Sequence, residues 1–138
     1  MGKAAEICKT RMQDESIKIA ELRNKLLKGI TDKVGDIRVN GSMDKRLPNN
    51  LNLCFKYVKA ENIIMEMRDI AVSTGAACTS ASLKPNHVLK AIGLTGDEIK
   101  SSVRFGLGRF NTEEEVEYVI EKLGSTLKGI RALEHSDI

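Results

Sequence analysis

The segment "GDIRVNGSMDKRLPNNLNLCFKY", Gly35 to Tyr57, holds two strand-like runs separated by a short connection. In the second run two sets of side chains alternate along the chain, Leu51, Leu53, Phe55 and Tyr57 with Asn52, Cys54 and Lys56. This period of two predicts a strand with one face on the core. Between the runs, "RLPNN" breaks the chain. Because so short a connection cannot hold the crossover that parallel neighbours require, we expect a mostly antiparallel sheet.

Helical patterns lie on both sides of these strands. From Lys3 to about Gly29, apolar residues at helical spacing predict one long amphipathic helix. Its stripe consists of Cys8, Met12, Ile19, Leu22, Leu26 and Ile30. Residues 60–69 predict a short helix, and residues 85–93 predict another that Pro85 starts and Gly93 stops. Residues 111–133 predict a last helix, with Asn111 or Thr112 as its N-cap and a stripe of Val116, Val119, Ile120 and Leu123.

Residues 70–73, "IAVS", and 101–108, "SSVRFGLG", are two further strand-like runs. Strands and helices alternate irregularly, which predicts an α+β fold in two layers, a small sheet covered on one face by helices. We expect a single domain over residues 1–138, since this length suits one hydrophobic core. The first helix begins at residue 2 or 3 without a cap, as though the chain had been cut from something longer.

Composition excludes several classes of function. Hydrophobic residues make up 41% of the chain and charged residues 30%, as in a folded, soluble protein. A net charge of +3 and 4% aromatic residues argue against nucleic-acid and membrane partners. No apolar run is long enough for a membrane span or a secretory signal. The three cysteines never form a C-x-x-C pair, which argues against disulfides and a metal site and favours a reducing, cytoplasmic location.

One cysteine lies where little can pack around it. In "STGAACTSAS", residues 73–82, Cys78 is surrounded by Ser, Thr, Gly and Ala, and Gly75 lets the backbone bend. We expect a mobile, accessible thiol, either a functional nucleophile or a loop residue without a role. Lys84 or His87 would lower the pKa of the thiol if the loop folds back toward them. Taken alone, His87 is better explained as an exposed helix residue than as a general base.

Three other residues are candidates for a functional role. Arg104 lies in a strand between Val103 and Phe105, where it either holds a carboxylate or reaches solvent from an edge strand. Cys8 lies on the apolar stripe of the first helix, which favours a place in the core. Cys54 is either buried under another element or a bystander thiol.

Three stretches together resemble the C-terminal part of cysteine desulfurases of the NifS/IscS type. They are "RLPNNLNLCF" (46–55), "DIAVSTGAACTSASLKPNHVLKAIGL" (69–94) and "SSVRFGLGRFNTEEEVEYVIEKL" (101–123). "MGKAAEI" at the start also resembles the helix that leads into that family's small domain. The resemblance implies a pyridoxal-phosphate enzyme of aminotransferase fold type I, a cytoplasmic homodimer, of which this chain is the small C-terminal domain.

The resemblance also implies roles for individual residues. Cys78 matches the cysteine that takes sulfur from L-cysteine as a persulfide, leaving alanine, and Arg104 matches the arginine that pairs with the substrate carboxylate. Gly75, Lys84 and His87 would support the cysteine loop. Small neighbours would let the thiol move between the substrate and a sulfur acceptor, such as a scaffold protein for iron-sulfur cluster assembly.

The chain departs from the family pattern in two places. It contains no His-Lys pair that would match the cofactor lysine, and Gly106 stands where the family commonly has serine. We therefore expect pyridoxal phosphate in the complete enzyme and none on this chain, which by itself would be inactive. The alternative function, which is not enzymatic, is that of a persulfide carrier or a docking module.

Overall fold

The computed structural model describes residues 1–74 and 86–134. Its elements follow the order α1 (Gly2–Lys33), β1 (Ile37–Val39), β2 (Asn50–Phe55), α2 (Ala60–Glu66), α3 (His87–Ala91), α4 (Gly96–Lys100), β3 (Ser102–Gly106) and α5 (Glu113–Glu134). Within the described ranges the strands form one sheet in the order β1-β2-β3, and both pairs are antiparallel. The predicted α+β fold with a small antiparallel sheet is confirmed.

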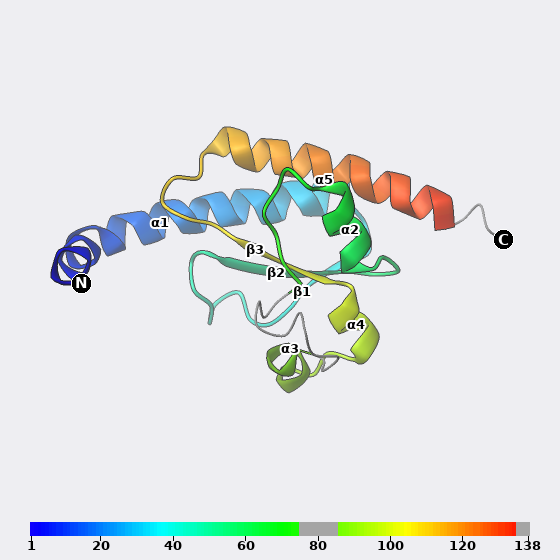
Figure 1. The fold of residues 1–138 in the computed structure, drawn as a ribbon, viewed down its shortest axis with the longest axis horizontal. Coiled ribbons are helices and arrows are strands. Elements are labelled where there is room, and N and C mark those ends of the chain that lie inside the picture. Colours follow the sequence, from blue (N-terminus) through cyan, green and yellow to red (C-terminus); the bar gives the residue numbers. More distant parts are fainter. Residues whose placement is uncertain (75–85, 135–138) are drawn as a thin grey trace.

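The long helices α1 and α5 cover one face of this sheet and run in the same direction (Figure 1). Leu51, Leu53 and Phe55 of β2 face them and are fully buried. Each such side chain contributes about 1.5–3 kcal/mol when it leaves water, so this layer supplies most of the hydrophobic stabilisation. The predicted stripe of α5 is confirmed, since Val116, Ile120 and Leu123 are buried and Val119 is partly buried in the same core.

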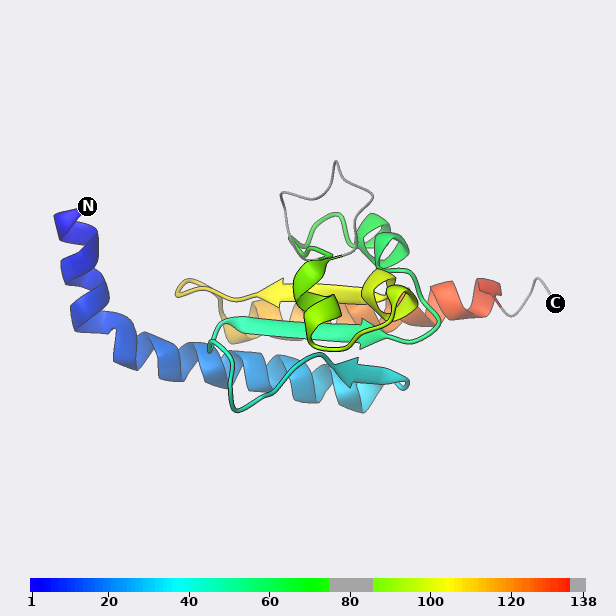
Figure 2. The ribbon, with the colours of Figure 1, turned by 90° about the horizontal axis from the view of Figure 1, so that it is seen from below.

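Only the second half of α1 packs on the sheet. Its buried residues are Leu22, Arg23, Leu26 and Ile30. The first half extends past the strands (Figure 2), and there Cys8 is exposed and Met12 is 63% exposed. The prediction that Cys8 is a core residue is therefore wrong, because its part of the apolar stripe has no sheet beneath it.

The other face of the sheet, which we call the polar face, carries Arg38, Asn40, Asn52, Cys54, Ser102 and Arg104. The helices α3 and α4 lie on this side (Figures 1 and 2). The alternation is confirmed over Leu51 to Phe55, whereas Tyr57, predicted on the core face, follows β2 and is 78% exposed. The prediction of a single buried face is wrong, because Leu51 to Phe55 are all buried. The reason is that β2 is the central strand and α4 contacts it on the polar face. Cys54, left open by the sequence, is 1% exposed.

Local differences concern the shorter elements. Residues 70–73 form no strand, and only Ser73 makes an antiparallel bridge, to Arg104. The helix expected from Pro85 begins at His87 and is capped by the side chain of Asn86. Gly93 follows it with φ +90°, as expected of a stop signal. The helix α4 was not predicted from the sequence, although Thr95 and Glu98 form a complete capping box at its start.

Capping also fixes the start of α5. The Thr112 hydroxyl accepts from the Glu115 backbone N–H at 3.3 Å, and the Glu115 carboxylate accepts from the Thr112 N–H at 3.2 Å. Of the two predicted N-caps, Thr112 is the one that makes this bond. Among the described residues, no helix is both long and apolar enough to span a membrane.

Candidate active site

Arg104 lies in the middle of β3 with its side chain on the polar face. It is half-buried, and its register partner on β2 is Asn52. Within the described ranges its guanidinium makes no hydrogen bond or ion pair. β3 is an outer strand of the sheet, as the solvent reading of Arg104 assumed, but the side chain is only partly exposed there. A half-buried guanidinium without an acceptor is a group available to an anion.

The segment that leads to Cys78 is tied to Arg104 by the main chain. The Ser73 N–H donates to the Arg104 carbonyl at 3.2 Å, and the Arg104 N–H donates to the Ser73 carbonyl at 2.6 Å. Cys78 follows Ser73 by five residues in the sequence. Cys78 itself, together with Gly75 and Lys84, lies outside the described residues, and the prediction of a mobile loop falls there too.

His87 is the first residue of α3 and its side chain is exposed. In the described part of the chain no hydrogen bond or ion pair joins it to Arg104. Groups of His, Cys, Asp or Glu arranged to hold a metal ion do not occur in residues 1–74 and 86–134.

A cluster of buried polar side chains lies beside Arg104 on the polar face. The Asn40 Nδ2 donates to the Asn52 Oδ1 at 2.7 Å and to the Ser102 Oγ at 2.9 Å. Ser102 in turn donates to the Glu98 carbonyl at 2.6 Å. Sequence reasoning did not single out this cluster. The available signal was the polar Asn52 inside an otherwise apolar strand, since a buried polar side chain requires a partner.

Glu98 connects the cluster to β1 and to the start of α4. Its carboxylate accepts from the Thr95 N–H and pairs with the Arg38 guanidinium, both at 2.8 Å. These contacts, the Thr95 backbone bond above all, hold the pKa of Glu98 below its ordinary value. Near them, burial raises the pKa of the Cys54 thiol, which keeps this thiol protonated and inert.

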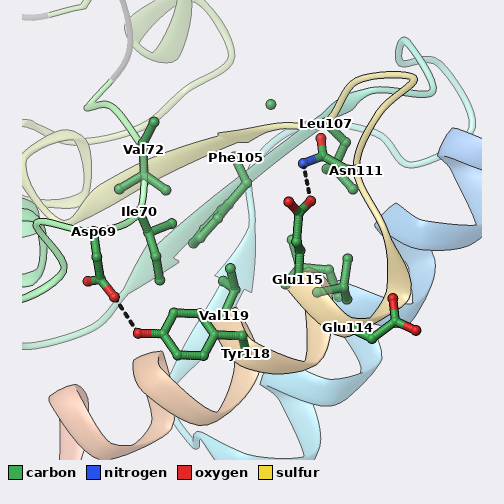
Figure 3. Close-up of a pocket in the computed structure, with 14 residues that line it drawn as sticks. Asp69, Ile70, Val72, Phe105, Leu107, Asn111, Glu114, Glu115, Tyr118 and Val119 are labelled. Atoms are coloured by element: carbon green, nitrogen blue, oxygen red, sulfur yellow. Dashed lines mark hydrogen bonds between the residues drawn. The ribbon is translucent and has the colours of Figure 1, made fainter.

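A pocket of about 580 Å³ opens between residues 69–72, the end of β3 and the first turns of α5 (Figure 3). Ile70, Val72 and Phe105 line it with apolar surface, and carboxylates lie at its rim. Tyr118 donates to Asp69, which holds the pKa of Asp69 below its ordinary value. The Asn111 amide donates to Glu115 at 2.8 Å.

Pyridoxal phosphate does not fit this pocket. Its phosphate is an anion, and the pocket presents Asp69, Glu114 and Glu115. The described residues that line the pocket include no lysine and no arginine.

The comparisons with known proteins define the class. The model of the aminotransferase class-V family matches residues 1–119, so the chain belongs to the aminotransferase class-V family. Among curated relatives, the cysteine desulfurase IscS of Anaeromyxobacter dehalogenans is 47% identical over 133 residues, and that of Proteus mirabilis is 48% identical over 133 residues. Each match covers 96% of this chain and 33% of the relative, so the chain spans about a third of the length of these relatives.

Solved structures agree with this assignment. A NifS-like protein from Rickettsia africae superimposes with a TM-score of 0.79 at 26% identity, over 92% of this chain and 33% of that one. DndA from Streptomyces lividans gives a TM-score of 0.55 at 28% identity, over 75% and 29%. The small sheet with its helices is thus a fold found within NifS-like proteins. Homology to the class-V aminotransferases implies pyridoxal phosphate in the full enzyme.

Proposed function

We propose that this chain is the C-terminal small domain, residues 1–138, of a cysteine desulfurase that converts L-cysteine to L-alanine. Cys78 would take the sulfur as a persulfide, and Arg104 would anchor the substrate carboxylate. The observation that carries the proposal is the backbone pairing of Ser73 with Arg104 beside a guanidinium without an acceptor among the described residues. It ties the segment leading to the thiol to a group that is ready for a carboxylate.

The proposed reaction needs no external oxidant. The Cys78 thiolate attacks the substrate sulfur, an S–S bond forms and the substrate C–S bond breaks. The electron pair of that C–S bond goes to carbon, which takes a proton and becomes the methyl group of alanine. The persulfide then passes its outer sulfur to the thiolate of an acceptor, such as an iron-sulfur scaffold protein. Arg104 would hold the carboxylate during the attack, which fixes the distance between the two sulfur atoms.

The rest of the enzyme would supply what this chain does not offer. Pyridoxal phosphate would be held by residues beyond these 138, in a cytoplasmic homodimer. The isolated chain, mixed with pyridoxal phosphate and L-cysteine, should therefore release no alanine and no sulfide above a blank without protein. Steady turnover by the isolated chain would contradict the proposed division of roles.

The second candidate function is a persulfide carrier that receives sulfur from an active desulfurase. It is favoured by the same thiol on a chain whose described pocket does not fit the cofactor. The test is the intact mass of the chain after incubation with an active desulfurase and L-cysteine. A carrier gains the mass of one sulfur atom and loses it on reduction.

Matched variants make this mass test specific. Cys8 is exposed and competes for sulfur, whereas Cys54 is buried. Cys8→Ser should keep the added sulfur, and the double variant Cys8→Ser/Cys78→Ser should lose it. A sulfur atom absent from Cys8→Ser, or retained in full by the double variant, would exclude Cys78 as the acceptor in both candidate functions.

A further inference from the structure

Two hydrogen-bond donors lie side by side on the polar face. Asn52 and Arg104 are register partners on β2 and β3, so their Cβ atoms are about 4.5–5.5 Å apart on one face of the sheet. Asn52 is 9% exposed and Arg104 is half-buried. Within the described ranges, neither the Asn52 Nδ2 nor the Arg104 guanidinium donates a hydrogen bond. An acceptor is therefore expected from outside these residues.

The orientation of the Asn52 amide follows from Ser102. The Ser102 hydroxyl donates its single hydrogen to the Glu98 carbonyl, so toward Asn40 it can only accept. This requires the Nδ2 of Asn40 on that side, and its other hydrogen goes to the Asn52 Oδ1. Turning the Asn40 amide over would place its Oδ1 against two acceptors.

Within the part of the chain that the structure describes, this arrangement leaves one buried acceptor of the cluster unpaired. The Asn40 Oδ1 is buried and has no partner among the described atoms, so the donated bonds decide how the amide lies. With its Oδ1 committed to Asn40, Asn52 keeps Nδ2 as the group that remains free. Arg104 cannot be the partner of this Nδ2, because both groups are donors.

From this geometry we infer that Asn52 is a second ligand of the substrate carboxylate, beside Arg104. The inference rests on the proposed desulfurase function and adds a residue to its substrate site. One carboxylate oxygen would accept from the guanidinium and the other from the Asn52 Nδ2, since a carboxylate accepts on both oxygens. The amide adds direction without a second cation, and Asn40 and Ser102 preset that direction before the substrate arrives.

The test uses the full-length enzyme with Asn52→Asp. Aspartate keeps an oxygen that accepts from Asn40, replaces the donor by an anion and pairs with Arg104. The KM for L-cysteine should rise about tenfold or more, with a smaller change in kcat, because one charge-assisted hydrogen bond is lost. Asn52→Ala should raise the KM in the same direction. Asn50→Ala is the matched control, on the same strand and face and opposite Gly106, and should leave the KM unchanged.

A second readout separates binding from folding. L-Alanine carries the carboxylate, whereas ethylamine has the same amine without it. Asn52→Asp should weaken inhibition by L-alanine about tenfold and leave inhibition by ethylamine unchanged. If Asn52→Asp fails to fold by circular dichroism, Asn52→Ala gives the same comparison. Equal weakening of both inhibitors would show a structural effect and overturn the inference.

Arg104→Gln distinguishes the inferred role of Asn52 from the proposed desulfurase function. A raised KM for Arg104→Gln, with both Asn52 variants equal to Asn50→Ala, would overturn the role of Asn52 alone. An unchanged KM for Arg104→Gln would overturn the carboxylate anchor of the proposed function itself. Raised KM values for Arg104→Gln and both Asn52 variants, with L-alanine affected and ethylamine not, support the inference.

Discussion

The structure describes the surroundings of two of the three cysteines, and the two thiols differ in their exposure to solvent. Cys8 is exposed on the free half of α1, whereas Cys54 is 1% exposed on the central strand. Burial raises the pKa of the Cys54 thiol. Because the thiolate is the nucleophile, reactivity depends on both exposure and pKa. Residue type alone therefore does not define a reactive cysteine in this chain.

These surroundings predict different rates of alkylation. In the folded chain, Cys54 should react with iodoacetamide about tenfold or more slowly than Cys8, and the two should react alike in denaturant. Peptide mass spectrometry after timed quenching measures both rates. Equal rates in the folded chain would contradict the buried position of Cys54.

Glu98 predicts a pH dependence of stability. Its pKa in the folded chain is held below the ordinary value of 4.5, mainly by the Thr95 backbone bond and also by Arg38. A depressed pKa means that the carboxylate stabilises the fold above pH 4.5 and that this contribution is lost as the pH falls through the folded-state pKa. Glu98→Gln should lower the Tm at pH 7 and approach the wild-type Tm in acid.

Thermal melts of both proteins between neutral and acid pH give this measurement. Asp97→Asn is the control, since Asp97 lies on the same helix and makes only a 4.0 Å contact with Lys100. A Tm difference for Glu98→Gln that stays constant with pH would contradict the role given to its charge.

Among the secondary-structure elements, the contact between α1 and α5 depends on a glycine. A Cβ added at Gly29 would lie 2.3 Å from the Ile120 Cδ1 and 2.9 Å from its Cγ1. Only glycine lets the two helices approach this closely without moving Ile120. Ion pairs flank the contact, with Lys25 at 2.7 Å from both Glu113 and Glu117. These pairs are solvent-exposed, so they orient the helices more than they stabilise them.

Gly29→Ala should therefore lower the free energy of unfolding by about 1–3 kcal/mol, because overpacking outweighs the gain in helix propensity. Gly124→Ala is the matched control on α5. Its Cβ would meet Lys33 at an ordinary 3.6 Å, so propensity should raise stability by about 0.5–1 kcal/mol. Urea denaturation measures both changes, and a stabilised Gly29→Ala would contradict the close approach.

At the scale of the whole molecule, the main core joins residues from α1, the sheet, α2 and α5. A smaller cluster, Leu89, Leu94 and Ile99, lies around α3 and α4. The second half of α1 and the helix α5 thus meet in the main core, whereas the helices near the polar face depend on few buried side chains. Local opening is expected there before the main core unfolds.

Leu123 tests the main core. It is fully buried on α5, and Leu123→Ala should lower the free energy of unfolding by about 2–5 kcal/mol. Leu133→Ala, on the same helix, should change it by less than about 0.5 kcal/mol, since Leu133 is 71% exposed. Chemical denaturation of both variants makes the comparison, and similar losses would show that α5 does not anchor the core.

Local patterns in the sequence determined the order and type of most elements. The stripe of α5, the second half of the α1 stripe, the alternation along β2 and the strand around Arg104 were all predicted, because side-chain periodicity follows backbone geometry directly. The resemblance carried by residues 46–123 pointed to NifS/IscS-type cysteine desulfurases, and the match over residues 1–119 confirms the aminotransferase class-V family. The roles of Cys78, Gly75 and Lys84 stay predictions, since these residues lie outside the described ranges.

Tertiary structure alone decided which surfaces are covered. Cys8 lies on an apolar stripe yet is exposed, and Cys54 lies among the polar positions of its strand yet is buried, because only Cys54 lies between packed layers. The pairing of Asn52 with Arg104, and the Asn40 bonds that orient it, join residues up to 62 positions apart. Such contacts depend on strand register and on what packs against each face, and a local pattern along one strand contains neither.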